Sequence, residues 1–403
     1  MSQIELKKPY KSALRFVLLI GVVSFFADFT YEGSRSVTGP LLSVLGASAV
    51  IVSIIAGLGE LLGYGLRLVS GPLSERTGEF WPITLFGYFI QMLSVPALAF
   101  ARTWPEAATL ILIERIGKAI RNPPRDVMLS HAAKEMGYGW GFGVHEALDQ
   151  AGALFGPLLV AVMLSWRGEY RLAYETLLIP ALLTLSFLLV ARFVYPKPED
   201  FDTTRPKSEE RSSFSETFRL YLAGAALVAA GFADFTLIAF HFKNSHAVPS
   251  VWIPIFYSVA MAVSGLGSLF FGRLFDRQGI RVLVPLTIIT TISAPLVFLG
   301  HFAAALIGAA LWGLGMGVHE SIIPAVVATM VPAGRRPTAY GLFTGVYGVA
   351  WFLGSVLIGF LYEVSPRAVV IFCVLIQLAA VPFFRLVRTK LGRNSMPEQP
   401  ETS

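Results

Sequence analysis

Apolar residues occur along this chain in runs long enough to form helices that cross a membrane. A membrane-spanning helix needs about 20 consecutive, mostly apolar residues. Runs of this kind predict twelve helices, with the polar residues gathered between them. The predicted spans are 13–33, 48–70, 81–101, 104–122, 140–165, 172–194, 216–242, 250–271, 281–300, 302–323, 338–362 and 367–387. The pattern therefore predicts an all-α membrane protein with twelve transmembrane helices.

Composition and charge agree with this prediction and add an orientation. The chain is 55% hydrophobic and only 14% charged, which is typical of a polytopic membrane protein. On this layout 23 of the 32 basic residues lie on the side of the two termini. Because basic loops stay in the cytoplasm, we expect both termini there, in a bacterial inner (plasma) membrane. The same bias accounts for most of the net charge of +6, so no nucleic-acid partner is indicated.

The chain contains an internal repeat. The sequence Phe-Ala-Asp-Phe-Thr occurs at 26–30 and again at 232–236, and it places Asp28 and Asp234 at matched positions in two apolar spans. A charged side chain near the bilayer centre costs about 2.5–3.5 kcal/mol on insertion scales, so two at matched positions indicate a function. Three weaker echoes support a duplication, and all four are separated by 198 to 206 residues.

The repeat covers six predicted spans, an even number, so both copies have the same orientation in the membrane. We therefore expect two pseudo-symmetric six-helix bundles, at 1–195 and 216–403. The polar, Pro-, Ser- and Glu-rich segment 196–215 between them is predicted to be a flexible cytoplasmic linker. Asp28 and Asp234 should face each other across the internal two-fold, where secondary transporters place their cargo site.

One of the echoes carries a family signature. The segments Gly-Pro-Leu-Ser-Glu-Arg-Thr-Gly at 71–78 and Gly-Arg-Leu-Phe-Asp-Arg-Gln-Gly at 272–279 follow the pattern G-x-L-a-D-R-x-G, with Glu75 replacing the aspartate in the first copy. Through this signature the chain resembles the major facilitator superfamily over nearly its whole length. In that family the loop is a cytoplasmic latch whose carboxylate meets a helix end of the other bundle. The resemblance implies latch residues at Gly71, Glu75, Arg76, Asp276 and Arg277.

A second signature lies in the span 140–165. Gly143, Gly152, Gly156 and Pro157 resemble the motif G-(x8)-G-(x3)-G-P of proton-coupled exporters in the superfamily, although its closing glycine pair is absent. Glycines at helical spacing let two helices approach closely, and proline permits a bend. The alternative is ordinary packing of small residues.

The span 104–122 and the residues after it resemble a poorly characterised prokaryotic branch of the superfamily, through the sequence R-I-G-K-A-I-R-N-P-P-R-D. Arg115 matches the arginine that takes part in proton coupling in the family. The paired prolines Pro123 and Pro124 are predicted to end this helix, because proline cannot continue the backbone ladder.

Charged residues within the spans indicate which helices line a pathway. In the superfamily fold the first, fourth, seventh and tenth spans line the central cavity, and all four carry charges here. Asp28, Glu32 and Arg35 share one helix face, as do Asp234 and His241. These residues are expected past the midpoint of their spans, toward the outside. The predicted substrate and proton-coupling residues are Asp28, Glu32, Arg35, Glu114, Arg115, Lys118, Asp149, Asp234 and His241.

A second charged cluster is expected toward the cytoplasm. Together with Arg115 and the latch residues, it consists of Arg121, His145, Glu146, His319 and Glu320. Two clusters on either side of a central site suggest two gates, each of which breaks when its side opens. The alternative is static ion pairing that holds the helices in register. Glu60, which lies among glycines, is interpreted as a packed partner between helices.

The expected function is secondary active transport by alternating access, as a proton-coupled antiporter for efflux of a small organic compound. Charges of both signs suit a cationic, zwitterionic or amphiphilic cargo. The expected partners are protons, this cargo and the bilayer, and the protein is expected to be a monomer. No cofactor or resident metal is predicted, and the energy source is the proton gradient.

Other functions remain open at this point. A divalent-metal exporter could use Asp28, Glu32, Asp234 and His241 as ligands. A non-transporting receptor and a lipid scramblase are the alternatives from other classes. An enzyme is not expected, because no G-x-S-x-G, H-E-x-x-H or Cys-rich pattern occurs and Cys373 is the single cysteine.

Overall fold

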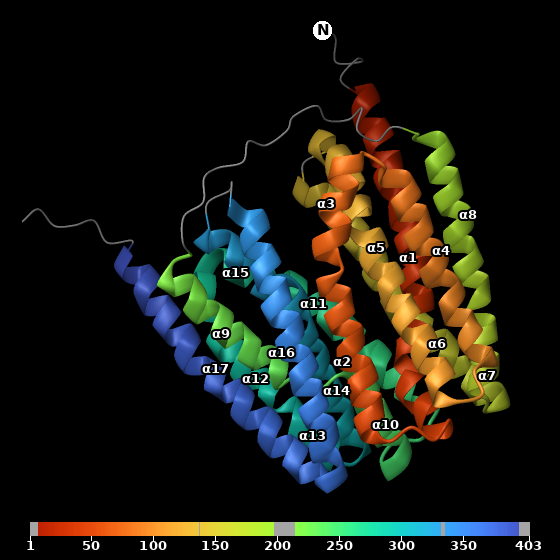
Figure 1. Cartoon of the computed structure of the whole chain (residues 1–403), viewed down its shortest axis with the longest axis vertical. Coiled ribbons are helices and arrows are strands. Elements are labelled where there is room, and N and C mark those ends of the chain that lie inside the picture. The colour runs from red at the N-terminus through yellow and green to blue at the C-terminus, as the bar shows by residue number, and fades with distance from the viewer. Residues whose placement is uncertain (1–6, 137, 197–213, 332–334, 395–403) are drawn as a thin grey trace, which may run out of the picture.

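The computed structural model describes residues 7–136, 138–196, 214–331 and 335–394, and Figure 1 shows the chain as two adjacent groups of helices. Every regular element within these ranges is a helix, and no strand occurs in them. The predicted all-α fold is therefore confirmed. Most of the predicted linker, 197–213, lies outside the described residues.

The first half of the chain, here the N half, consists of α1 (Lys7–Val44), α2 (Ala49–Gly65), α3 (Arg67–Thr77), α4 (Phe80–Ala97), the 3-10 turn η1 (Leu98–Phe100), α5 (Trp104–Met136), α6 (Tyr138–Arg167), α7 (Tyr170–Thr176) and α8 (Leu178–Val194). The second half, the C half, consists of α9 (Glu216–Ala230), α10 (Phe235–Ser245), α11 (Trp252–Gln278), the 3-10 turn η3 (Gly279–Val282), α12 (Leu283–Thr291), α13 (Ser293–Leu299), α14 (Phe302–Gly317), the π-helical turn η4 (Val318–Ile322), α15 (Ile323–Met330), α16 (Arg336–Val364) and α17 (Pro366–Asn394).

Ten helical stretches in the described residues are long and apolar enough to cross a membrane. One of them, Trp252–Leu299, has 48 residues and contains α11, α12 and α13, which is far more than one crossing requires. Helix α5 is not among the ten, although its 33 residues would suffice for a crossing. The chain is thus a multi-pass membrane protein, and the count of twelve spans stays a prediction.

Both copies of the repeated glycine motif end a helix in the same way. Gly78 follows α3 with φ 70°, and Gly279 follows α11 with φ 58°. A positive φ at this position is accessible to glycine without a Cβ clash, which explains why both motifs close with glycine. The motif residues before these glycines lie in the last turns of α3 and α11, so the expected loop is wrong.

Helix α5 does not end at Pro123 and Pro124, as the sequence predicted, but continues to Met136. Proline at 123 removes the N–H that would bond to the carbonyl of Ala119. Ser70 of α3 compensates for this loss, because its Oγ donates to the Ala119 carbonyl oxygen at 2.8 Å. A side chain from a neighbouring helix thus lets the prolines remain inside a membrane helix.

Helix α1 is longer than its predicted span, because it continues to Val44. The apolar run that predicted 13–33 is followed by Ser, Arg and Thr residues, and these are buried against other helices. Asp28 consequently lies near the middle of α1, 21 residues after its first residue and 16 before its last. Asp28 thus lies slightly past the midpoint of α1, and the expectation that it lies toward the outside stays a prediction.

The two halves are packed together at one end of the molecule. Helix α1 begins and α17 ends toward the same end, here called the terminus side, and the opposite end is the far side (Figure 1). One apolar core joins both halves and takes its N-half members from the far-side parts of those helices. A second core at the terminus side contains residues of the N half alone.

Close backbone approaches hold the halves together at the far side. A Cβ on Gly39 of α1 would collide with the Thr236 carbonyl and would lie 2.8 Å from the Phe240 nitrogen of α10. A Cβ on Gly57 of α2 would lie 2.7 Å from Cβ of Ser355 in α16. Only glycine permits helices to come this near.

Candidate functional site

The polar residues of the membrane interior are arranged along α1. Ser24, Asp28, Glu32 and Arg35 occur at intervals of three or four residues, so they form one stripe on this helix. All four side chains are buried. Helix α1 packs against α5 and α6 of its own half and against α10 and α11 of the other half, so the stripe can reach partners in both.

At the far-side end of the stripe, Arg35 joins the two halves. Its Nη2 lies 3.0 Å from Oε1 of Glu60 in α2 and 3.1 Å from Oδ2 of Asp234 at the start of α10. The same Glu60 oxygen lies 3.2 Å from Nη2 of Arg115, whose Nε lies 3.7 Å from Glu114. We call these five residues the far-side network. It contains three carboxylates and two guanidinium groups, all about nine-tenths buried or more.

Asp234 lies at a break in the predicted helix that contains it. The sequence predicted one helix over 216–242, but the backbone leaves the helix after Ala230 and re-enters it at Phe235. Asp234 is the N-cap of α10, because its Oδ1 accepts a hydrogen bond from the Thr236 backbone N–H at 2.8 Å. Asp234 therefore holds a helix N-terminus and a guanidinium group at once.

Other side chains satisfy the backbone groups that this break exposes. Gln377 of α17 donates to the Gly231 carbonyl at 2.9 Å, and the Trp312 indole of α14 donates to the Ala233 carbonyl at 2.8 Å. A broken helix inside a membrane requires such partners. Breaks of this kind occur at the binding sites of transporters, where the half-helix N-terminus points at bound charge.

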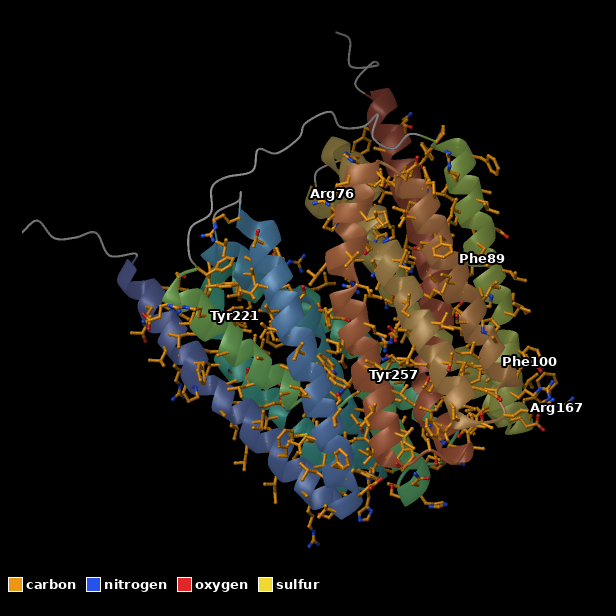
Figure 2. The ribbon with its side chains drawn as sticks, in the orientation of Figure 1. Arg76, Phe89, Phe100, Arg167, Tyr221 and Tyr257 are labelled. Atoms are coloured by element: carbon orange, nitrogen blue, oxygen red, sulfur yellow. The ribbon has the colours of Figure 1, made fainter. Side chains whose placement is uncertain are left out.

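Glu32 of α1 connects the N half to the C half, and Tyr31 lies beside it in the sequence. The Tyr257 hydroxyl of α11 donates to Glu32, and Figure 2 shows Tyr257 between the two halves. The Tyr31 ring lies between two cations, with Lys118 Nζ 3.7 Å from its centroid and the Arg115 guanidinium carbon 5.1 Å from it. The centre of the protein thus combines aromatic rings with charges of both signs.

A second group of polar residues lies toward the terminus side, within the N half. Arg121 lies 3.6 Å from Asp28, and its Nη1 donates to the Tyr88 hydroxyl at 2.8 Å. Gln91 of α4 accepts from Arg121 Nε, and its amide donates to Glu114 at 2.7 Å. Gln91 therefore connects this group to the far-side network, because it contacts both Glu114 and Arg121 of α5.

His145 of α6 extends this second group. Its Nε2 lies 2.8 Å from Ser24 Oγ, to which Arg125 also donates at 3.3 Å. Arg125 in turn pairs with Asp126 at 2.8 Å. We refer to Asp28, Arg121, Arg125, Ser24 and His145 as the terminus-side network.

The glycines of the predicted exporter motif differ in their surroundings, because two of them contact α1 and one borders open space. Cβ atoms on Gly152 and Gly156 would collide with the Phe25 and Phe29 carbonyls of α1, so these two glycines set the approach of α6 to α1. His145 of α6 contacts the same helix, through Ser24. Around Gly143, in contrast, there is open space. Pro157 lies within α6 and is buried.

Four hydrogen bonds or ion pairs join the N half to the C half among the described residues. Two of them are Arg35–Asp234 and Tyr257–Glu32. The others are Ser43 Oγ to Asn244 Oδ1 at 2.7 Å and Ser258 Oγ to the Leu154 carbonyl at 3.0 Å. None involves the terminus-side parts of the helices. The far side is closed by polar contacts, and the described terminus side is not.

The predicted gate residues do not pair across the halves in this conformation. Glu75, Arg76, Asp276 and Arg277 are exposed at the helix ends, as Figure 2 shows for Arg76, and Gly71 is half-buried. His319 in the π-helical turn η4 lies with its Nδ1 2.6 Å from the Tyr347 hydroxyl of its own half.

The remaining acidic gate residues are exposed. Glu146 accepts from Gln150 of its own helix at 3.0 Å, and Glu320 is exposed next to His319.

Two placements from the sequence are wrong. Arg115 was expected in the cytoplasmic cluster, but it pairs with Glu60 of α2, because α2 packs against α5 at this level. His241 was expected to share a site with Asp234. Its Nδ1 instead lies 2.9 Å from the Tyr362 hydroxyl of α16, about two turns along α10 from the Asp234 cap.

Asp28 and Asp234, the matched residues of the repeat, belong to different networks. Asp28 pairs with Arg121 and Asp234 with Arg35, and no contact joins the two carboxylates among the described residues. Likewise, no group of three or more His, Cys, Asp or Glu side chains in the described ranges could hold a metal ion. The four ligands considered for a divalent metal therefore do not converge in this conformation.

A small cavity lies against the far-side network. Its volume is about 20 Å³, which is room for about one water molecule. Its polar lining includes Tyr31, Ser34, Arg35, Thr38 and Arg115. A cavity of this size can hydrate the network but cannot hold an organic molecule, so the far side is sealed in this state.

Sequence reasoning missed six residues of the site, among them Ser24 and Arg125 of the terminus-side network. Glu60 was interpreted only as a packing residue, although a carboxylate inside an apolar span is itself a functional signal. Tyr257, Tyr88 and Gln91 carry no such signal, because uncharged polar residues are common in membrane helices. Their roles depend on which helices are neighbours.

The fold and the site define a polytopic membrane protein in which buried ion networks lie within and between two helical halves. The family model of the Major Facilitator Superfamily matches residues 17–319 and 258–402. The chain therefore belongs to the Major Facilitator Superfamily, a family of secondary transporters.

Individual relatives agree with this assignment. An uncharacterized protein of Mycobacterium tuberculosis (strain H37Rv), Rv2265, is 38% identical over 394 residues, which is 96% of either chain. An uncharacterized MFS-type transporter of Methanocaldococcus jannaschii, MJ1317, is 24% identical over 363 residues, covering 87% of this chain and 89% of that one.

The fold also matches a solved structure. It is a bacterial homolog of the human lysosomal transporter Spinster in an inward-facing and occupied conformation, with a TM-score of 0.76 and 16% identity. The match covers 97% of this chain and all of that one. At this identity it shows a shared fold alone.

Proposed function

We propose that this protein is a proton-coupled exporter of a small organic compound that is cationic, zwitterionic or amphiphilic. It works by alternating access, with the N half and the C half moving as two bundles. Its termini lie in the cytoplasm of a bacterial inner membrane, and the monomer is the working unit. In this assignment the terminus side is the cytoplasmic side, and the described conformation is open inward.

One observation carries the proposal. The far-side network places the Arg35 guanidinium between Glu60 of its own half and Asp234 of the other half. When the far side opens, Arg35 can leave Asp234 and keep Glu60, so it is never left without a counterion. A buried charge that lost its only partner would cost several kcal/mol. The arrangement suits a contact that must break and re-form in every cycle.

Two further features support the details. The packing of Gly152 and Gly156 against α1 agrees with the exporter motif, which supports efflux. Among the described residues, the helix bundle contains five buried carboxylates, including Asp28 and Glu32, and the Lys118 ammonium group lies over the Tyr31 ring. Rings and carboxylates together favour organic cations.

Transport by everted membrane vesicles tests the proposal. An imposed pH gradient, acidic inside, should drive uptake of ethidium or tetraphenylphosphonium into vesicles that contain the protein. Asp28→Asn and Asp234→Asn should abolish this flux while folding and membrane insertion remain normal. Flux at the wild-type level in both variants would remove the roles assigned to these residues.

The same vesicles separate the remaining functions. A receptor shows no flux with any probe, and a scramblase moves labelled lipid without a gradient. Gradient-driven movement of Ni²⁺, Co²⁺, Fe²⁺ or Mn²⁺ in place of the organic probes would contradict the organic cargo.

A further inference from the structure

The carboxylates inside the membrane differ in whether they have a partner. Asp28 pairs with Arg121, Glu60 with two arginines and Asp234 with Arg35, while Glu114 accepts from Gln91 and Glu32 from Tyr257. Asp149 of α6 is the exception among the described carboxylates of the helix bundle that are not exposed. Its Oδ1 is buried and accepts no hydrogen bond, and its carboxylate makes no ion pair.

We propose that Asp149 is the carboxyl group that binds the transported proton. This inference rests on the proposed proton coupling and assigns the site at which coupling occurs. An ionised carboxylate with a buried, unpartnered oxygen is costly, and binding a proton removes that cost. Protonation stabilises the paired carboxylates less, because an arginine or a hydroxyl group already compensates their charge.

The helices packed against α6 bring charges of both signs toward Asp149. Helix α1 contributes Asp28, α6 itself contributes Glu146, and α5 contributes Arg125 and Lys118. Helix α11 brings no charge to this level, since Gly265 is its contact with the neighbouring Gln150. Two acidic neighbours favour proton uptake at Asp149, and the two basic groups are available to the ionised form.

His145 and Ser24 connect this position to the terminus side. His145 lies one helical turn before Asp149 in α6, and its Nε2 is 2.8 Å from Ser24 Oγ. Both side chains are buried, whereas Glu146 beside them is exposed. A proton that leaves Asp149 toward the terminus side therefore meets hydrogen-bonding groups on its way out.

Lys118 links the proton to the centre of the molecule. In the structure the Lys118 ammonium group lies over the Tyr31 ring, and in this proposal it stays there while Asp149 is neutral. When Asp149 releases its proton, the O–H bond breaks, and the carboxylate left behind attracts Lys118 away from that ring. The ring face then becomes available to a cationic group of the cargo. Proton and cargo thus compete for the centre, as antiport requires.

Infrared spectroscopy tests the proton site without knowledge of the cargo. The difference spectrum of the purified protein between acidic and neutral pH should contain the C=O stretch of a protonated carboxyl group. Asp149→Asn should lose this band. Glu146→Gln, a matched control three residues away on the exposed side of the same helix, should keep it. A band that persists unchanged in Asp149→Asn overturns the proposal.

Flux measurements separate this inference from the proposed function. In Asp149→Asn, gradient-driven ethidium flux should fall to that of protein-free vesicles, whereas exchange of ethidium without a gradient should remain. Asp149→Glu should restore both the carboxyl band and part of the driven flux, which a loss of folding could not explain. Gradient-driven flux at the wild-type level in Asp149→Asn would contradict the role of Asp149 and leave the proposed function intact. A wild-type protein without gradient-driven flux would contradict the proposed function itself.

Discussion

The ion pair between Arg35 and Asp234 makes a quantitative prediction about the opening of the far side. Asp234→Asn removes one negative charge from the far-side network but leaves an amide oxygen that can still accept from the Thr236 N–H. The helix cap is therefore retained, and the cross-half ion pair is lost. Arg35 keeps its bond of 3.0 Å to Glu60, so no charge becomes unpaired.

The expected magnitude follows from these contacts. A hydrogen bond to a charged group contributes about 1.5–3 kcal/mol. This bond exists only while the far side is closed, so its loss should destabilise the closed state by about 2 kcal/mol relative to the open one. A shift of that size changes the equilibrium roughly 30-fold. A protein with its far side open about 1% of the time would then be open for roughly a quarter of the time.

Thiol labelling measures this shift. The native cysteine, Cys373, is fully buried and can be replaced by serine. Thr38→Cys then places a thiol at a position that is 5% exposed and lines the small cavity of the far side. A membrane-impermeant maleimide should label it faster in Asp234→Asn, in proportion to the open fraction.

The control is Asp126→Asn, which removes an ion pair of 2.8 Å that lies within the N half and involves a more exposed carboxylate. It should leave the labelling rate unchanged. Equal labelling rates in Asp234→Asn and the parent protein would refute the view that this ion pair holds the far side closed.

Three further predictions concern contacts that the sequence did not reveal. Ser70→Ala leaves a buried carbonyl of α5 without its donor and should cost about 1–3 kcal/mol, lowering the melting temperature in detergent. The loss should disappear in a Pro123→Ala background, where a backbone N–H replaces the hydroxyl group, and a loss that persists there would contradict the explanation. Gly39→Ala should increase far-side labelling because its Cβ collides with α10, whereas Gly63→Ala, with open space around it, should not. Tyr257→Phe should reduce gradient-driven flux without loss of folding, and unchanged flux would remove its role.

The sequence predicted most of the fold because the membrane imposes a simple rule. Long apolar runs must become helices, since no water is present to bond with the backbone. The same rule cannot predict that α5 continues past Pro123. The carbonyl group that this proline leaves free accepts a hydrogen bond from Ser70, which lies 53 positions before the proline. The rule also misses the break before α10, where Gln377 and Trp312 supply the missing donors. Irregular backbone depends on partners from other helices, and these become known only with the fold.

The candidate site was predicted in part for a related reason. A carboxylate or guanidinium group inside an apolar run is visible in the sequence, and this signal correctly pointed to Arg35 and Asp234 as buried charges. The signal does not say which charges meet. Arg115 bonds to Glu60 instead of the cytoplasmic cluster, and Asp28 bonds to Arg121 instead of facing Asp234. Pairing is a property of helix neighbours and of the rotation of each helix.

The break in the span before α10 has a mechanical consequence. Gln377 and Trp312, which hold its carbonyl groups, both belong to the C half. The kink is therefore anchored within one rigid body, and its bent shape does not have to change during the cycle. The N-terminus of the short helix α10, the positive end of its dipole, therefore keeps its orientation within the C half. Asp234 at this end is a fixed group to which Arg35 of the other half binds and from which it separates.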